Sequence, residues 1–177
     1  MGSAPSGGAL PHRERGREAA VRIAAVRSAE DLRAAGALMA AYGMSLGIDL
    51  SFQDFAAELA ALPGKYAPPA GEILLARGAD GEALGCVALR PMSQPGLCEI
   101  KRLFVVPGGR GLGIGRALVE AIRREAARIG YAGMRLDTLP FMSEAIALYR
   151  RAGFAPVEAY YETPVAGTIF LGRPVAG

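Results

Sequence analysis

The feature that most constrains this sequence is a glycine-rich segment between an extended stretch and an amphipathic one. Glycines stand at positions 108, 109, 111, 113 and 115. The preceding residues, Leu97 to Val106, have the composition of a strand, and from Ile114 to Ile129 large apolar residues recur at helical spacing until Gly130 offers a C-cap. The segment therefore predicts a strand–turn–helix unit.

A turn of this kind is suited to binding an anion. Glycine accepts positive φ and lets the backbone approach a ligand closely. The first turn of the following helix contributes unpaired N–H groups and the positive end of the helix dipole. Arg110 and Arg116 add positive charge at the two edges of the loop. We interpret the segment as a phosphate-binding loop; the alternative is a flexible connection without a ligand.

Two common nucleotide-binding motifs do not fit the loop. The pattern G-x-G-x-x-G fails because Arg116 stands three residues after Gly113, and Leu118 three residues after Gly115. A Walker A loop needs Gly-Lys followed by Ser or Thr, and the one Gly-Lys pair, at 64–65, precedes a tyrosine.

The rest of the pattern predicts a single α/β domain over residues 21–177, after a disordered Gly/Ser/Pro-rich leader at residues 1–20. The expected order is β-α-α-β-β-β-α-β-α-β-β. We expect strands at 21–26, 72–77, 82–90, 97–106, 134–138, 154–161 and 168–171, and helices beginning after Ser28 (broken at Gly43 and Gly47), after Ser51, at Ile114 and at Ser143.

The scarcity of histidine and cysteine narrows the chemistry. The one histidine, His12, lies in the leader, so residues 21–177 have no imidazole for a Ser-His-Asp arrangement or a metal site. We expect no bound metal. Cys86 and Cys98 form no CxxC pair and are expected to be buried thiols, although a covalent cysteine mechanism is an alternative.

Charge and hydropathy give expectations about partners and location. The net charge is +3, and Glu14 interrupts the basic cluster at 12–17, so we expect no nucleic-acid partner. There is neither an apolar stretch of about 20 residues nor a signal-peptide pattern, so we expect no membrane association and a cytoplasmic location.

Three segments, in order, resemble the GNAT (GCN5-related N-acetyltransferase) superfamily. Residues 110–115, Arg-Gly-Leu-Gly-Ile-Gly, match its signature Q/R-x-x-G-x-G/A. Residues 99–107 look like the fourth strand of the family, and residues 147–154 resemble its late A-x-x-L-Y-x-x-x-G-F segment. The resemblance runs from about Val21 to the C-terminus. It implies a mixed, mostly antiparallel central sheet flanked by helices.

The resemblance also implies acetyl-CoA as a co-substrate and a primary amine, of a small molecule or of a peptide or protein, as the acceptor. Backbone N–H groups would bind the pyrophosphate, and main-chain groups of the preceding strand would bind the pantetheine arm. By position, the pyrophosphate residues are Arg110, Gly111, Leu112, Gly113, Ile114, Gly115 and Arg116, and the pantetheine residues are Leu103, Phe104 and Val105. One departure is Met142, which stands where many members carry an asparagine.

Two residues are candidates for proton transfer. The resemblance places Tyr149 beside the sulfur of the cofactor, where a phenol could protonate the leaving thiolate. The alternative for Tyr149 is a core aromatic. Glu99 stands where some members carry a catalytic glutamate and is the candidate base, directly or through a water; the alternative is an ion pair with Lys101.

Further polar residues are expected near the cleft, and the sequence does not indicate which of them contacts the substrate. Lys101 and Arg102 are unusual within a strand, and either attract an acidic substrate or lie on a solvated face. Asp137, Thr138, Tyr160 and Tyr161 are expected to border the cleft or to line a substrate pocket. A non-catalytic acyl-CoA-binding module is the alternative function, and a homodimer is compatible with the sequence.

Overall fold

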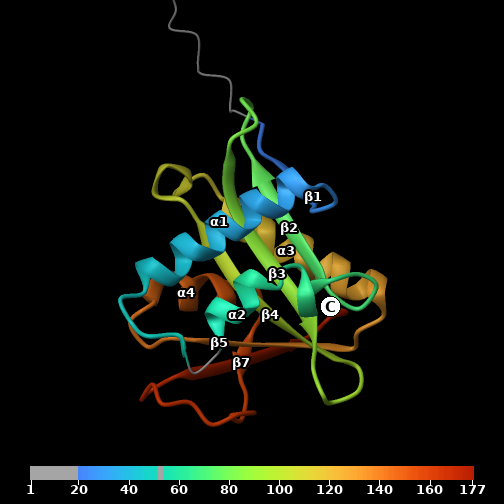
Figure 1. Cartoon of the computed structure of the whole chain (residues 1–177). Coiled ribbons are helices and arrows are strands. Elements are labelled where there is room, and N and C mark those ends of the chain that lie inside the picture. Colours follow the sequence, from blue (N-terminus) through green and yellow to red (C-terminus); the bar gives the residue numbers. More distant parts are fainter. Residues whose placement is uncertain (1–19, 52–53) are drawn as a thin grey trace, which may run out of the picture.

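The computed structural model describes residues 20–51 and 54–177. The predicted disordered leader, with His12, therefore lies outside the described residues except for its last position. Figure 1 shows the elements in the predicted order. The helices are α1 (Ala29–Ser45), α2 (Phe55–Ala60), α3 (Ile114–Ile129) and α4 (Ser143–Arg151). The strands are β1 (Arg22–Ala25), β2 (Glu72–Arg77), β3 (Ala83–Pro91), β4 (Leu97–Val105), β5 (Gly133–Thr138), β6 (Ala155–Pro156) and β7 (Ile169–Pro174).

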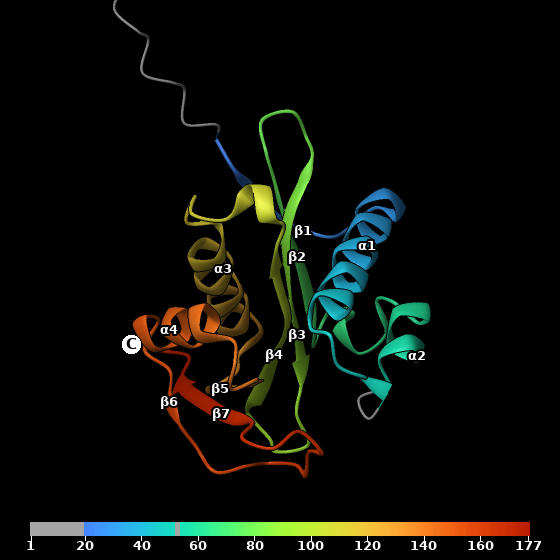
Figure 2. The same cartoon turned by 90° about the vertical axis from the view of Figure 1, so that its left-hand side faces the viewer.

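The described strands form one mixed sheet in the order β1-β2-β3-β4-β5-β7-β6. Every neighbouring pair is antiparallel except β4 and β5, which run parallel. Figure 2 shows α1 and α2 on one face of the sheet and α3 and α4 on the other. Each face has its own buried apolar cluster, so the sheet is covered on both sides. This arrangement is the mixed, mostly antiparallel sheet that the resemblance implied.

Sequence and structure differ at Gly43, where a helix break was predicted. Helix α1 begins after Ser28, whose hydroxyl accepts the N–H of Asp31 at 3.0 Å, and it continues through Gly43 to Ser45. A Cβ built on Gly43 would lie 2.4 Å from the Phe55 ring. Gly43 therefore permits close packing of α1 against α2 instead of ending the helix. Helix α2 begins only at Phe55, after Asp54 in the left-handed region (φ 52°).

The parallel pair β4 and β5 opens part-way along the sheet. Their register is confined to residues 97–99 of β4 opposite residues 133–135 of β5. Beyond this point β4 is bulged against β3, and Arg102 takes a positive φ of 61° within the bulge. A bulge bends its strand and redirects the adjacent side chains. The backbone of β4 and β5 beyond Glu99 and Arg135 therefore borders an opening in the sheet.

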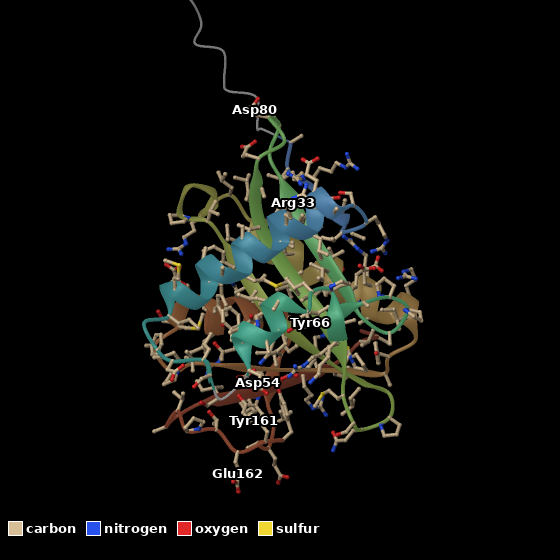
Figure 3. All side chains as sticks on the ribbon, viewed as in Figure 1. Arg33, Asp54, Tyr66, Asp80, Tyr161 and Glu162 are labelled. Atoms are coloured by element: carbon tan, nitrogen blue, oxygen red, sulfur yellow. The ribbon has the colours of Figure 1, made fainter. Side chains whose placement is uncertain are left out.

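The predicted strand at 154–161 is mostly wrong, because β6 contains only Ala155 and Pro156. Beyond β6 the chain turns so that the hydroxyls of Tyr160 and Tyr161 reach carboxylates on β4 and β5. Figure 3 places Tyr161 at the end of the molecule opposite the β2–β3 turn at Asp80. These long-range contacts override the local preference for a strand.

Across the residues that the structure describes, no helix is both long and apolar enough to cross a membrane. No group of His, Cys, Asp and Glu side chains in this part of the chain is arranged to hold a metal ion.

Candidate active site

The glycine loop presents backbone N–H groups to solvent. Gly111 and Gly113 have φ angles of 79° and 75°, and a Cβ built on either would meet nothing within 4 Å. No backbone hydrogen bond within the described residues uses the N–H groups of residues 111–116. Since unpaired N–H groups at a helix N-terminus attract anions, the segment has the geometry of a phosphate site.

A long groove runs from this loop past the end of β4 to α4. All the residues that the sequence assigned to the cofactor line it except Leu112, whose side chain is 65% exposed. Basic residues outnumber acidic ones along its walls. The basic residues are Arg110, Arg116, Arg123, Arg151 and Arg173, and the acidic ones are Glu120 and Glu144. The groove is thus electrostatically suited to a polyanionic ligand.

A second, smaller cavity adjoins the groove where β4 and β5 diverge. The two hollows share Tyr42, Leu103, Met142 and Ala145 as lining residues. The other residues of the smaller cavity are Leu46, Leu50, Ile100, Lys101, Arg102, Asp137, Thr138, Leu139 and Tyr149. A ligand in the groove and a second molecule in the cavity would therefore meet at the shared wall.

Tyr149 lies on α4 and lines the smaller cavity. Its side chain is buried, and its ring packs edge-on against Phe154 with centroids 5.8 Å apart. Its hydroxyl forms no hydrogen bond with any other described residue. Burial raises the pKa of Tyr149 above its usual value, so the phenol is protonated at neutral pH. The ring is therefore a core aromatic, which was one of the two interpretations, and its hydroxyl has no hydrogen-bond partner in the part of the chain that the structure describes.

Lys101 and Asp137 form a buried ion pair in the cavity wall. The Lys101 Nζ lies 3.0 Å from Asp137 Oδ1, and Tyr161 donates a 2.7 Å hydrogen bond to Asp137 Oδ2. Burial alone would raise the pKa of Asp137, but the Lys101 charge and the two hydrogen bonds outweigh it and leave the pKa below its usual value. Asp137 is therefore an ionised carboxylate at neutral pH.

Glu99 is buried and fully engaged with neighbouring side chains. Arg90 binds one of its oxygens with contacts of 2.7 and 2.8 Å, and the Tyr160 hydroxyl donates to the other at 2.9 Å. The ion pair with Lys101, which sequence reasoning gave as the alternative, is present at 3.8 Å. Glu99 is not among the residues that line the cavity, and Lys101 lies between it and Asp137.

Arg102 is held beside the cavity by α2. Its guanidinium forms an ion pair with Glu58 and lies 4.7 Å from the centroid of the Phe55 ring. The Tyr66 hydroxyl donates to the same glutamate. Although burial opposes ionisation, Arg102 and Tyr66 keep the pKa of Glu58 below its usual range. A solvated sheet face was one of the two interpretations of Lys101 and Arg102 from the sequence. In the structure both side chains are buried.

Neither cysteine has the surroundings of a nucleophile. Cys86 and Cys98 are fully buried and donate to the backbone carbonyls of Arg102 and Gly133. Burial raises the pKa of each thiol to about 12. Neither lines the groove or the cavity, so the expectation of buried thiols is confirmed.

Sequence reasoning missed Tyr42, which lies in the wall common to groove and cavity. Tyr42 falls on the apolar face of α1, where its ring packs against Phe104 at 6.2 Å, so its pattern is that of a core residue. No local signal separates Tyr42 from its apolar neighbours. Met142, flagged as a departure from the family, also lies in this wall.

Comparison with known proteins agrees with this geometry. The profile of the acetyltransferase (GNAT) domain matches residues 69–156. An uncharacterised N-acetyltransferase of Schizosaccharomyces pombe is 42% identical over 151 residues, which cover 85% of this chain and 93% of the relative. An IAA acetyltransferase of Azospirillum brasilense is 38% identical over 112 residues, 62% of this chain and 71% of the relative.

The fold has counterparts among solved structures. A GNAT-family acetyltransferase of Staphylococcus aureus superposes with a TM-score of 0.73 at 19% identity, over 88% of this chain and 99% of that chain. The chain belongs to the GNAT family, and it is an acetyltransferase.

Proposed function

We propose that the protein transfers an acetyl group from acetyl-CoA to a primary amine by direct attack within a ternary complex. The amides of residues 111–116 and the neighbouring arginines would bind the diphosphate, and the end of β4, at Leu103 to Val105, would bind the pantetheine arm. The acceptor would occupy the smaller cavity and meet the thioester at the shared wall.

The observation that carries the catalytic proposal is the Tyr149 hydroxyl, which is protonated, forms no hydrogen bond within the described residues and lines the smaller cavity beside the shared wall. In the proposed reaction the amine nitrogen forms a bond to the acetyl carbonyl carbon, and the carbon–sulfur bond then breaks. The departing thiolate takes a proton, which Tyr149 supplies. General acid assistance of this kind contributes typically ~10²–10⁴-fold to a rate.

The acceptor must also lose a proton, since an alkylamine with a pKa near ~10 is almost wholly ammonium at pH 7. Our hypothesis is that Glu99 is the base. Because Glu99 does not line the cavity, it would accept the proton through an intermediary. Arg90, Lys101 and Tyr160 contact Glu99, and of these three only Lys101 lines the cavity. Asp137 does line the cavity, but a lowered pKa makes it a poor proton acceptor and a good site for an ammonium ion.

A thiol-release assay with acetyl-CoA and a panel of amines tests the proposal. Amine-dependent release of CoA supports it. Tight acetyl-CoA binding without release on any amine would instead indicate the non-catalytic acyl-CoA-binding module.

A further inference from the structure

The charged groups around the smaller cavity balance one another. Each cation is paired with an anion. The pairs are Arg90 with Glu99, Lys101 with Asp137, and Arg102 with Glu58. Five of these six side chains are at most 16% exposed, and Arg90 is 27% exposed. The cluster is therefore close to neutral and largely shielded from water.

This balance discriminates among acceptors by their charge. An ion moved from water into a protein interior loses several kcal/mol of solvation unless an opposite charge compensates it. An acceptor carrying only an ammonium would leave the cluster with an excess positive charge. One that carries both an ammonium and a carboxylate leaves it neutral. Lys101 and Asp137 both line the cavity, and each can exchange part of their mutual contact for the opposite charge of such an acceptor.

The arrangement of the charges matches an acceptor whose two ionic groups share one carbon atom. Lys101 Nζ and Asp137 Oδ1 lie 3.0 Å apart, so an ammonium beside Asp137 leaves a neighbouring carboxylate within reach of Lys101. Apart from Arg102, Thr138 and the tyrosines Tyr42 and Tyr149, the remaining wall is apolar. Leu46, Leu50 and Leu139 form a buried cluster of their own there, and Tyr42 and Met142 pack against it.

From this arrangement we infer that the acceptor is an α-amino acid with an apolar side chain, its ammonium bound by Asp137 and its carboxylate by Lys101. The inference rests on the proposed function, which it narrows to one class of amine. Leucine is a suitable probe, because 3-methylbutylamine is the same molecule without its carboxylate. A tripeptide Leu-Gly-Gly presents the same α-amine with the carboxylate moved far away.

The first experiment measures kcat/KM of the full chain for these three acceptors, expressed per concentration of unprotonated amine so that their different pKa values do not decide the result. We expect leucine to exceed both others by at least ~10-fold, a difference of about one well-placed ionic contact. Equal or faster acetylation of 3-methylbutylamine or of the tripeptide would overturn the inference and leave the proposed function intact. Absence of thiol release on every amine, with acetyl-CoA still bound, would overturn the proposed function itself.

The second experiment removes the positive charge of Lys101, the group assigned to the carboxylate of the acceptor. Lys101→Met should lower kcat/KM for leucine by at least ~10-fold and raise it for 3-methylbutylamine, because Asp137 then needs a cation from the acceptor. Lys101→Arg should restore the preference for leucine. The measured quantity is the ratio of kcat/KM for leucine to kcat/KM for 3-methylbutylamine. The change in this ratio between variant and wild type does not depend on amine pKa, and a loss of folded protein would lower both rates together.

Lys65→Met is the matched control, since Lys65 is the other lysine of the sequence and is exposed outside both hollows. It should leave the ratio unchanged. A ratio that is the same in Lys101→Met and in wild type would contradict the assignment of Lys101 to the carboxylate. Should Lys101→Met fail to fold, the wild-type comparison of the three acceptors still decides the matter.

Discussion

Lys101 on β4 and Asp137 on β5 lie opposite each other two residues beyond the last paired register of their strands, and their side chains close the gap with a 3.0 Å contact. The pairing between β4 and β5 ends at Glu99 and Arg135, and beyond it the ion pair links the two strands. Buried ion pairs are weak contributors to stability compared with apolar packing. The position of this pair beside a cavity suits a role in recognition.

Removal of the Tyr149 hydroxyl tests the proposed acid. Tyr149→Phe should lower kcat by ~10²-fold or more and change the affinity for acetyl-CoA little, because the hydroxyl forms no hydrogen bond within the described residues and Tyr149 does not line the groove. Steady-state kinetics and calorimetry measure the two effects. Tyr131→Phe is the control, since Tyr131 donates to the Ala70 carbonyl away from both hollows and should leave turnover unchanged. Unchanged turnover in Tyr149→Phe would end its role as acid.

A side chain at Gly113 should abolish binding of acetyl-CoA. Gly113→Val places a branched group at φ 75° on the open side of the loop, where the diphosphate would lie. Gly81→Val carries a similar backbone strain, of roughly 1–2 kcal/mol, at φ 82° in the β2–β3 turn. Both variants should lose similar thermal stability, while only Gly113→Val loses binding by calorimetry. Retained binding in Gly113→Val would remove the loop from the cofactor site.

Glu99→Gln separates a base from a structural anion. If Glu99 accepts the acceptor's proton through an intermediary, Glu99→Gln should lower kcat ~10²-fold in folded protein. Glu72→Gln is the control, because Glu72 is equally buried and bound by Arg27, remote from the cavity. A Glu99→Gln variant that loses stability as Glu72→Gln does, with kcat of the folded protein unchanged, would show that Glu99 only supports the fold.

Replacement of both thiols should leave catalysis in place. The double variant Cys86→Ala, Cys98→Ala should retain turnover within ~2-fold while unfolding at a lower temperature, since each site loses about 1 kcal/mol of packing. Turnover and thermal unfolding of the same sample measure both effects. Loss of turnover in folded protein would revive a covalent mechanism.

The Asp137 carboxylate should make stability depend on pH in acid. Its pKa is lower in the folded chain than in the unfolded one, so its contribution is complete above its ordinary pKa of ~3.9 and is lost as the pH falls through the folded value. Asp137→Asn should cost about 3 kcal/mol at neutral pH, and the difference from wild type should shrink below pH ~4. Urea unfolding across pH measures this. A difference between Asp137→Asn and wild type that stays constant across this pH range would contradict the assignment.

Much of the site was predictable because its signals are local. The glycine loop, the amphipathic α3 and the position of Tyr149 on α4 each depend on a few consecutive residues. Asp137 and Lys101 stand 36 residues apart, and only the divergence of β4 from β5 makes them partners. The sequence predicts a strand at Tyr160 and Tyr161, because no neighbouring residue indicates that their hydroxyls bind carboxylates on β4 and β5.

The contact between α3 and α4 has a mechanical consequence. A Cβ on Gly115, in the first turn of α3, would lie 3.2 Å from Leu148, the residue before Tyr149. The absence of that atom lets the first turn of α3 pack directly against α4, which carries Tyr149. Under the proposed function, this contact sets the distance between the diphosphate loop and the phenol, so we expect a thioester on an arm shorter than that of CoA to bind the loop without reaching Tyr149.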